Sequence, residues 1–318
     1  MKKVLAALPN YSKYCSKAKK YLQENGCEVI ENETGGPLTQ EQLKELVGDI
    51  DAAIAGVEIW DAEIMDAAPR LKVITRFGVG VDNFDLAEAK KRNIICTNCP
   101  GINSASVAEH TVMLILNLLR ECPQLYQEAK SGIWRRLMVT ELGGKTVGLL
   151  GFGAVARKVA AMLSGFSCNI LAYDKYPNEN AAMELGVKLC SQEELLQKSD
   201  IISVHVPATP ETYHLINSNT LAMCKDGVYI VNTSRGTNVD EQAVSSALAS
   251  KKLAGFASDV FEFEPVTAKY PLFKFKNYIC TPHTAAESYE NYAETGMRTA
   301  QAILDVLNGN QEPWHKLV

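Results

Sequence analysis

The sequence predicts an α/β protein with two domains, each built on a mostly parallel sheet. Short apolar segments alternate with helical segments along the chain, as in strands joined by crossover helices. The length of 318 residues suits two domains better than one. A glycine loop of the kind that usually opens a domain, GFGAVA at 151–156, follows almost half of the chain, so another domain is expected before it.

The first hundred residues show this alternation by themselves. Helices are predicted at 13–25, at 41–47 after a capping Thr39, and around Ile64 and Ala87. We therefore expect a first parallel sheet with helices on both faces. Its strands are predicted in the apolar segments 3–9, 27–32, 52–56, 71–75 and 93–97.

The remainder of the chain repeats the pattern around the glycine loop. A long helix rich in apolar residues is predicted at 104–120, and another long helix at 285–308. Ser191 and Glu194 form a capping-box pattern at the start of a shorter helix. The strands of this second sheet are predicted at 147–151, 169–174, 187–190, 201–207, 229–234, 255–260 and 278–282.

The composition excludes several classes of protein. The chain is 47% hydrophobic and carries a net charge of −5 without a long run of one sign, so neither nucleic acid nor an anionic membrane is an expected partner. The apolar stretch before Pro9 has only five residues, too few for a signal peptide. The apolar segment 112–119 is too short to span a membrane.

Cysteine usage indicates a reducing compartment. Nine cysteines are scattered along the chain, which is typical of a cytoplasmic enzyme that keeps them reduced. Cys96 and Cys99 form a single C-x-x-C pattern, and without a second pair a zinc site is not expected. The two cysteines are interpreted as small residues at the end of a strand, with a redox pair as the alternative.

The glycine loop has the features of a dinucleotide-binding turn. Gly151 permits a tight turn from strand to helix, Gly153 lets the backbone approach a pyrophosphate, and Ala156 is small enough for close packing. The amides at the start of the following helix can hold an anion. Asp174 ends the next strand, 21 residues after Gly153, where an acid is expected to bind the adenosine ribose. The alternative is an ordinary turn and a surface aspartate.

Ionisable side chains follow three later strands. The stretches NTSRG, SDVFEFEP and TPH supply Arg235, Asp259, Glu264 and His283 at strand ends, where open α/β sheets place functional groups. A histidine that exchanges a hydroxyl proton, a carboxylate that orients it and an arginine that holds a substrate carboxylate suit proton-coupled hydride transfer. Alternatively, Arg235 and Glu264 are surface charges, or Asp259, Glu262, Glu264 and His283 bind a metal. His214 and His315 are expected to face solvent.

Seven motifs in order make the sequence similar to a known family. They are LKVITRFGVGVDNFDL, CPGINSASVAEHT, ELGGKTVGLLGFG, HVPATPET, NTSRG, DVFEFEP and TPH. The chain resembles the D-2-hydroxyacid dehydrogenase family, most closely its phosphoglycerate dehydrogenase-like branch. The resemblance implies two Rossmann-like or flavodoxin-like parallel-sheet domains. Residues 1–100 and 287–318 would form a discontinuous substrate domain, and residues 101–286 an NAD-binding domain.

The resemblance also implies an activity. It is the NAD-dependent transfer of hydride between a D-2-hydroxy acid and its 2-keto acid, of the 3-phosphoglycerate, hydroxypyruvate or glyoxylate class, without a metal. A cytoplasmic homodimer is expected, with the helix from Ser104 at its interface. The alternative is an NADH-sensing binding protein of the corepressor type with little turnover, a kind of protein that the family also contains.

Roles for individual residues follow from the matched motifs. Arg235, Glu264 and His283 are implied to be catalytic, and Arg76, Val79, Gly80 and Asn103 are implied to bind the substrate. Residues implied to contact the cofactor are Gly151, Gly153, Ala154, Val155, Asp174, His205, Val206, Pro207, Thr212, Thr233, Ser234, Asp259, His283 and Ala285.

The sequence departs from the family pattern in several places. Ala154 stands where a basic or polar residue is frequent, and Ala156 where glycine is usual. AGVEIW at 55–60 lacks the arginine and serine that many phosphoglycerate enzymes carry, and Glu58 would repel a phosphate if it faced the substrate. The sequence ends at Val318, so feedback through an appended regulatory domain is not expected.

Overall fold

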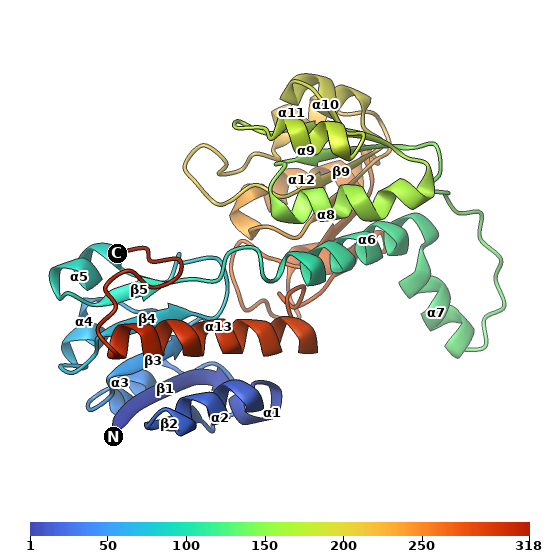
Figure 1. Cartoon of the computed structure of the whole chain (residues 1–318). Helices are drawn as coiled ribbons and strands as arrows, with labels where there is room; N and C mark the ends of the chain where they lie inside the picture. Colours follow the sequence, from blue (N-terminus) through green and yellow to red (C-terminus); the bar gives the residue numbers. More distant parts are fainter. The chain divides into compact units, whose positions relative to one another are not determined.

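The computed structural model describes residues 1–318 as two compact units (Figure 1). The first unit combines residues 1–103 with residues 287–318, and the second is the continuous segment 104–286. Each unit has its own parallel sheet. None of the helices combines the length and the apolar character that crossing a membrane requires.

The first unit is built on a five-stranded parallel sheet. The strand order is β2 (Cys27–Asn32), β1 (Lys2–Pro9), β3 (Ala52–Ala55), β4 (Val73–Arg76) and β5 (Ile95–Thr97). The helices are α1 (Tyr11–Tyr14), α2 (Ser16–Glu24), α3 (Gln40–Leu46), α4 (Ala62–Asp66), α5 (Leu86–Lys91) and α13 (Tyr289–Leu307). Helix α13 packs on α2 and on the strands β3 and β4.

Burial explains why the inner strands of this sheet contain apolar runs, whereas the edge strand β2 mixes polar and apolar residues. Residues 4–7 of β1 and 52–55 of β3 are fully buried, because helices cover both faces of the sheet. The side chains of Thr39, Asp61 and Asp85 cap helices α3, α4 and α5 by accepting backbone hydrogen bonds. Of these three caps, the sequence predicts the one at Thr39, and the structure confirms it.

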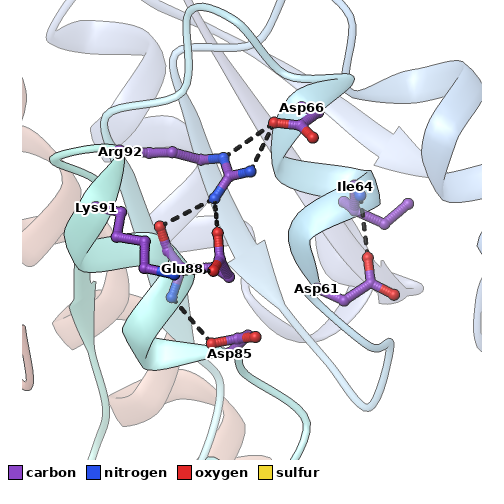
Figure 2. A network of polar contacts seen from close by, with 7 residues as sticks. All are labelled: Asp61, Ile64, Asp66, Asp85, Glu88, Lys91 and Arg92. Atoms are coloured by element: carbon purple, nitrogen blue, oxygen red, sulfur yellow. Dashed lines mark hydrogen bonds and ion pairs between the residues drawn. The ribbon is translucent and has the colours of Figure 1, made fainter.

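A charged network links α4 and α5 at the surface of this unit (Figure 2). Arg92 donates from Nε and Nη2 to Asp66 Oδ1 at 3.0 and 2.7 Å, and it also pairs with Glu88. Glu88 is paired with Lys91 as well. Surface pairs of this kind contribute little individually, so the network adds only modestly to the stability of the unit.

The second unit contains a seven-stranded parallel sheet. The order is β12 (Tyr278–Cys280), β11 (Leu253–Ser258), β10 (Val228–Asn232), β9 (Ile201–Val204), β6 (Thr146–Leu150), β7 (Asn169–Tyr173) and β8 (Lys188–Leu189). The direction of winding reverses between β6 and β9, which is where open sheets of this kind bind ligands. The helices are α6 (Ser104–Arg120), α7 (Cys122–Lys130), α8 (Ala154–Leu163), α9 (Glu179–Glu184), α10 (Gln192–Lys198), α11 (Ser218–Met223) and α12 (Glu241–Ala249).

Small residues allow close packing in the core of the second unit. Helices α6 and α8 run side by side (Figure 1), and Ala108, Ala156 and Ala160 are fully buried in one cluster with Leu149 of β6. Ala156 is therefore small for the reason that the sequence predicts, which is close contact of the helix with its neighbours.

The structure differs from the predicted elements at three points. Helix 13–25 is divided at Cys15 into α1 and α2, and the polar stretch after α6 contains the unpredicted α7. The last helix begins at Tyr289 rather than at 285, because the Ser288 side chain caps it by accepting from Asn291 N. The residues before Ser288 are instead part of a turn after β12, described below.

Candidate active site

A histidine–carboxylate pair lies at the carboxyl end of the second sheet. His283 Nδ1 is 2.7 Å from Glu264 Oε2, and the other carboxylate oxygen of Glu264 accepts from Phe261 N at 2.9 Å. Glu264 belongs to the loop after β11, and His283 to the turn after β12. The two residues are therefore brought together by neighbouring strands, as the sequence predicts.

The surroundings of Glu264 favour its ionised form. Burial opposes ionisation most strongly, but the hydrogen bonds from His283 and Phe261, together with the positive charges of His283 and Arg235, lower the pKa of Glu264 below its usual value. Glu264 is therefore a carboxylate at neutral pH. As a carboxylate it can accept the Nδ1 proton of His283 and fix the orientation of the ring.

Arg235 is held by the turn that follows β10. Asn232, the last residue of that strand, accepts from Ser234 N and Oγ at 3.0 and 2.7 Å and donates from Nδ2 to the carbonyl of Arg235 at 2.9 Å. The guanidinium Nη1 donates to the Ser234 carbonyl at 2.8 Å. This arrangement fixes the backbone on both sides of Arg235.

Gly236 allows the turn of Arg235 to lie against the loop of Glu264. A Cβ atom at this position would be 1.9 Å from the carbonyl carbon of Phe261 and 2.4 Å from Glu262 N, closer than any real contact. Only glycine therefore fits between the two backbones. The charge of Arg235 acts on Glu264 across this contact.

Asp259 organises the turn that carries His283. It is almost completely buried, and its carboxylate accepts from Thr281 Oγ1 at 2.6 Å, Thr284 N at 2.9 Å and Ala285 N at 2.9 Å. Its carbonyl accepts from His283 N at 2.7 Å. His283 has φ of +52°, a backbone conformation that non-glycine residues rarely adopt. These four hydrogen bonds hold the histidine in that conformation.

A second histidine extends this network from helix α6. His110 Nε2 lies 2.8 Å from Thr281 Oγ1. Because the Thr281 hydroxyl donates its one proton to Asp259, His110 must donate from Nε2 to Thr281. Sequence reasoning placed His110 only on a helix, and the Thr281 that precedes His283 by two residues carried no signal of this contact.

The glycine loop has space for a ligand above the start of α8. Gly151 has φ of +92°, and a Cβ there would lie 2.9 Å from the His205 backbone, so a side chain is excluded. A Cβ at Gly153 would meet no atom within 4 Å. No protein atom therefore packs against this side of Gly153, and Ala154 and Val155 begin the helix beyond it.

Asp174 lies directly beside this loop, after β7. Its Oδ2 accepts from Phe152 N at 2.7 Å and its Oδ1 from Tyr176 N at 2.8 Å. The carboxylate is thus anchored at the edge of the glycine loop, in the place expected of an acid that selects a ribose diol.

The remaining residues predicted to contact a cofactor lie after β9 and β10. Burial lowers the pKa of His205 to about 4, so this ring is neutral at physiological pH, and its Nε2 is 2.9 Å from Ser203 Oγ. Val206 accepts from Asn238 Nδ2 at 3.0 Å, Pro207 from Thr212 Oγ1 at 2.6 Å, and Thr233 Oγ1 is 2.8 Å from Thr111 Oγ1. Asn238 Nδ2 also donates to Ser234 Oγ at 3.0 Å, which joins the two loops.

The residues predicted to bind the substrate lie in the first unit: Arg76 ends β4, Val79 and Gly80 follow it, and Asn103 follows β5. Arg76 folds over the following loop and donates to the carbonyls of Phe77 and Gly80, both at 2.9 Å. Gly78 has φ of +147°, and the Val79 carbonyl accepts from Asn98 Nδ2 at 2.8 Å. Asn103 is the last residue before α6. The loop of Val79 and Gly80 is therefore shaped by side chains on both sides.

One sequence interpretation needs correction, and one condition is decided. His214 does not simply face solvent, because its Nε2 lies 2.9 Å from Glu262 Oε1. Glu58 is 5% exposed and accepts from Gly56 N at 2.8 Å, and burial raises its pKa. The error about His214 arose because a polar residue in a loop was taken to be solvated when the fold supplies it with a partner.

The alternative interpretations of the cysteines and carboxylates find no support. No group of three or more His, Cys, Asp or Glu side chains is arranged to hold a metal. Cys96 and Cys99 are both buried, and burial raises the pKa of each thiol to about 12. Neither thiol is therefore a reactive thiolate at neutral pH.

Comparison with known proteins identifies the family. The model of the D-isomer specific 2-hydroxyacid dehydrogenase, NAD binding domain, matches residues 112–285, which is more than half of the chain. The chain belongs to the D-isomer specific 2-hydroxyacid dehydrogenase family. The predicted family and the fold of two parallel-sheet α/β domains are confirmed by this match and by the sheet topology.

Relatives in the D-2-hydroxyacid dehydrogenase family have different named activities. The chain is 41% identical over 310 residues to a D-3-phosphoglycerate dehydrogenase of Archaeoglobus fulgidus, which covers 96% of this chain but only 58% of the relative. It is 39% identical to a glyoxylate reductase of Thermofilum pendens, over 90% of this chain and 87% of the relative. The D-lactate dehydrogenase of Aquifex aeolicus, solved with NAD and lactic acid, has a TM-score of 0.86 at 27% identity, over 99% of each chain.

Proposed function

We propose that this protein is an NAD-dependent oxidoreductase that interconverts a small D-2-hydroxy acid and its 2-keto acid. The observation that carries the proposal is the 2.7 Å pair of His283 and Glu264, with the turn of Arg235 packed against the same loop. In this proposal the second unit binds NAD and the first unit binds the substrate. The family match and the relatives that are dehydrogenases or reductases support the same activity.

The geometry of the pair assigns the proton transfer to one ring atom. His283 Nδ1 faces Glu264, so Nε2 is the nitrogen left to exchange a proton with the substrate hydroxyl. When the keto acid is reduced, His283 donates this proton to the carbonyl oxygen, and Glu264 stabilises the protonated ring beforehand. NADH, when bound, would supply the hydride to the carbonyl carbon of the keto acid.

The proposal names the protein groups that bind the negatively charged substrate. Arg235 binds the carboxylate and polarises the carbonyl, as a guanidinium can with two parallel hydrogen bonds. In the first unit, the backbone amides of Val79 and Gly80, together with Arg76 and Asn103, are the groups proposed to bind the substrate. The hydrogen bonds from Arg76 to Phe77 and Gly80 shape this loop, which supports the proposal that the loop is a preformed binding site for an anion.

The glycine loop is proposed to hold the pyrophosphate of NAD. The open space at Gly153 and the amides at the start of α8 suit an anion, and His205, Val206, Pro207, Thr212, Thr233, Ser234, Asp259 and Ala285 line the remainder of the cofactor site. The residues present therefore fit a dinucleotide.

Asp174 is expected to make the enzyme prefer NADH to NADPH. Its carboxylate is anchored by Phe152 N and Tyr176 N beside the glycine loop, and it would repel a 2′-phosphate while accepting from a ribose diol. The measurement is kcat/KM for both coenzymes with one keto acid, for the wild type and for Asp174→Ser. Equal efficiency of the wild type with both coenzymes would contradict this role. Lys175, the next residue, is the cation expected to weaken the preference.

The proposed substrate is small and without a phosphate group. The loop 56–60 offers no cation, and its one charged side chain, Glu58, points into its own backbone. Val57 and Ile59 on either side of it are 59% and 54% exposed. Asn83 Nδ2 joins this loop to the one after β4 by donating to the carbonyls of Gly56 and Glu58 at 3.2 and 2.6 Å.

We therefore do not expect 3-phosphohydroxypyruvate to be strongly preferred over hydroxypyruvate. One missing charge-assisted hydrogen bond costs about 1.5–3 kcal/mol, or roughly ten- to a hundred-fold in affinity. The measurement is the ratio of kcat/KM for 3-phosphohydroxypyruvate to that for hydroxypyruvate, with NADH. A ratio above about a thousand, or some 4 kcal/mol, would show that cations such as Arg76, Arg135 or Arg136 complete a phosphate site.

The direct test of the proposed function is oxidation of NADH with a panel of 2-keto acids. Hydroxypyruvate and glyoxylate are expected to give steady-state turnover that depends on the concentrations of both enzyme and keto acid. NADH binding without turnover on any member of the panel would favour the alternative, a protein that senses NADH and acts by binding.

A cytoplasmic homodimer is proposed as the form in which the enzyme works. The nine free cysteines support a reducing compartment. Sedimentation of the purified protein measures the oligomeric state directly.

A further inference from the structure

A second histidine–carboxylate pair lies two residues from Glu264, in the loop after β11. Glu262 Oε1 is 2.9 Å from His214 Nε2 and accepts from Tyr213 OH at 3.3 Å. The Tyr213 and His214 rings are stacked, with their centroids 4.0 Å apart and their planes at 16°. Only 17% of the Glu262 side chain and 27% of the His214 side chain are exposed, so this is not a fully solvated surface pair.

The backbone of Glu262 is anchored as well. Glu262 N donates to Oε1 of Glu241, the first residue of α12, at 3.0 Å. On the opposite side of the pair, His214 N donates to the Thr237 carbonyl at 2.8 Å. His214 has φ of +50°, a left-handed backbone conformation that non-glycine residues rarely adopt. We call Tyr213, His214, Glu241 and Glu262 the Glu262 clasp.

The clasp joins the loops that follow three neighbouring strands. Tyr213 and His214 follow β9, Glu241 follows the turn after β10, and Glu262 follows β11. Gly236 lies inside this arrangement, with its backbone pressed against Phe261 and Glu262. Arg235 directly precedes Gly236 in one loop, and Glu264 follows Glu262 by two residues in the other loop. A change in the contact between these loops is therefore expected to move the Arg235 guanidinium relative to the Glu264 carboxylate.

We infer that Glu262 is a positioning residue, which through His214 and Tyr213 fixes the distance between Arg235 and the Glu264–His283 pair. This inference rests on the proposed function, because it gives the clasp the task of aligning the proposed catalytic residues. Glu262 itself touches neither substrate nor cofactor in this assignment. A small displacement of oriented groups is enough to lower turnover by about a hundred-fold.

The test compares Glu262→Leu, Glu262→Gln and His214→Leu with the wild type. Glu262→Leu should raise KM for hydroxypyruvate and lower kcat, together at least ten-fold in kcat/KM, while the Kd for NADH stays within two-fold. Glu262→Gln keeps an oxygen that accepts from His214 and should retain most of the activity. The double variant Glu262→Leu with His214→Leu should be little worse than Glu262→Leu alone, because the two residues act as one unit.

A matched control lies at the other end of the same sheet. Asp226 precedes β10 and pairs with Lys252 at 2.7 Å, so Asp226→Leu removes an ion pair of the same unit without touching the three loops. This variant should leave KM, kcat and NADH binding unchanged. Activity of Glu262→Leu within two-fold of the wild type, or a loss of NADH binding equal to the loss in kcat/KM, would overturn the inference.

Amide hydrogen exchange separates the clasp from the proposed reaction. Glu262→Leu should increase exchange in peptides covering 234–240 and 259–265, and leave peptides from β6 and β7 unchanged. A wild type that turns over no 2-keto acid would refute the proposed function. The exchange result would then test only whether the Glu262 clasp holds the two loops, and unchanged exchange in both loops would refute that role.

Discussion

Replacing His283 with alanine is expected to lower kcat for keto acid reduction by about 10²–10⁴-fold, while NADH still binds. The imidazole is the only group in the proposed mechanism that donates a proton to the carbonyl oxygen. Its loss leaves the glycine loop, Asp174 and the loop after β9 intact, so the coenzyme site should be preserved. Stopped-flow turnover and fluorescence titration of NADH measure the two effects separately. Near-native turnover of His283→Ala would show that the proton comes from elsewhere.

The companion variant Glu264→Gln tests the direction of the electrostatic effect. Because the pKa of Glu264 is lowered, its carboxylate is charged throughout the neutral range and stabilises protonated His283. Glutamine keeps a similar shape but removes the negative charge that favours the protonated ring. The pH optimum of keto acid reduction should therefore move to lower values. An optimum that stays in place or moves upward would contradict the role of Glu264.

Gly236→Ala is expected to have the second largest effect. The added methyl group would lie 1.9 Å from the Phe261 carbonyl carbon, and the neighbours are backbone atoms that cannot rotate away. Overpacking of this kind costs about 1–3 kcal/mol of stability. The two backbones must separate, which moves Arg235 away from Glu264, and about a hundred-fold loss in kcat/KM is expected from such a misplacement.

The matched control for this variant is Gly165→Ala. A Cβ at Gly165 meets no atom within 4 Å, and its φ does not require glycine, so stability and kcat/KM should stay near the wild-type values. Thermal unfolding and steady-state kinetics of both variants are the measurements. A Gly236→Ala enzyme with wild-type kcat/KM would show that the contact between the two loops does not align the site.

The fold was predictable from local pattern where local causes decide it. Inner strands such as β1, β3 and β6 contain continuous apolar runs, and Thr39 marks a helix start by a short-range hydrogen bond. The break of the first helix at Cys15 and the presence of α7 were missed. Helix α7 buries none of its side chains, so no buried apolar face marks it in the sequence, and α1 has only four residues.

The candidate site was predictable in its components but not in its geometry. Strand ends pointed to Arg235, Glu264 and His283, because parallel strands gather such residues at one edge. The contact at Gly236, the anchoring of the His283 turn by Asp259 and the pairing of His214 with Glu262 join residues from different strands. The inward turn of Glu58 is local, but it depends on burial by the whole first unit. These features follow from tertiary structure, which no single-segment pattern records.

The discontinuous first unit has a consequence for the order in which the chain folds. One face of its sheet is covered by α13, whose Ala300, Ile303 and Leu304 are buried in one cluster with Val4 and Ile54. The ribosome makes these helix residues after residues 104–286, so while that segment emerges β1 and β3 lack the part of their apolar cover that α13 provides. The second unit needs no later segment and can complete its sheet first, although its synthesis begins later. During that interval the early strands are the part of the nascent chain most exposed to aggregation and most in need of a chaperone.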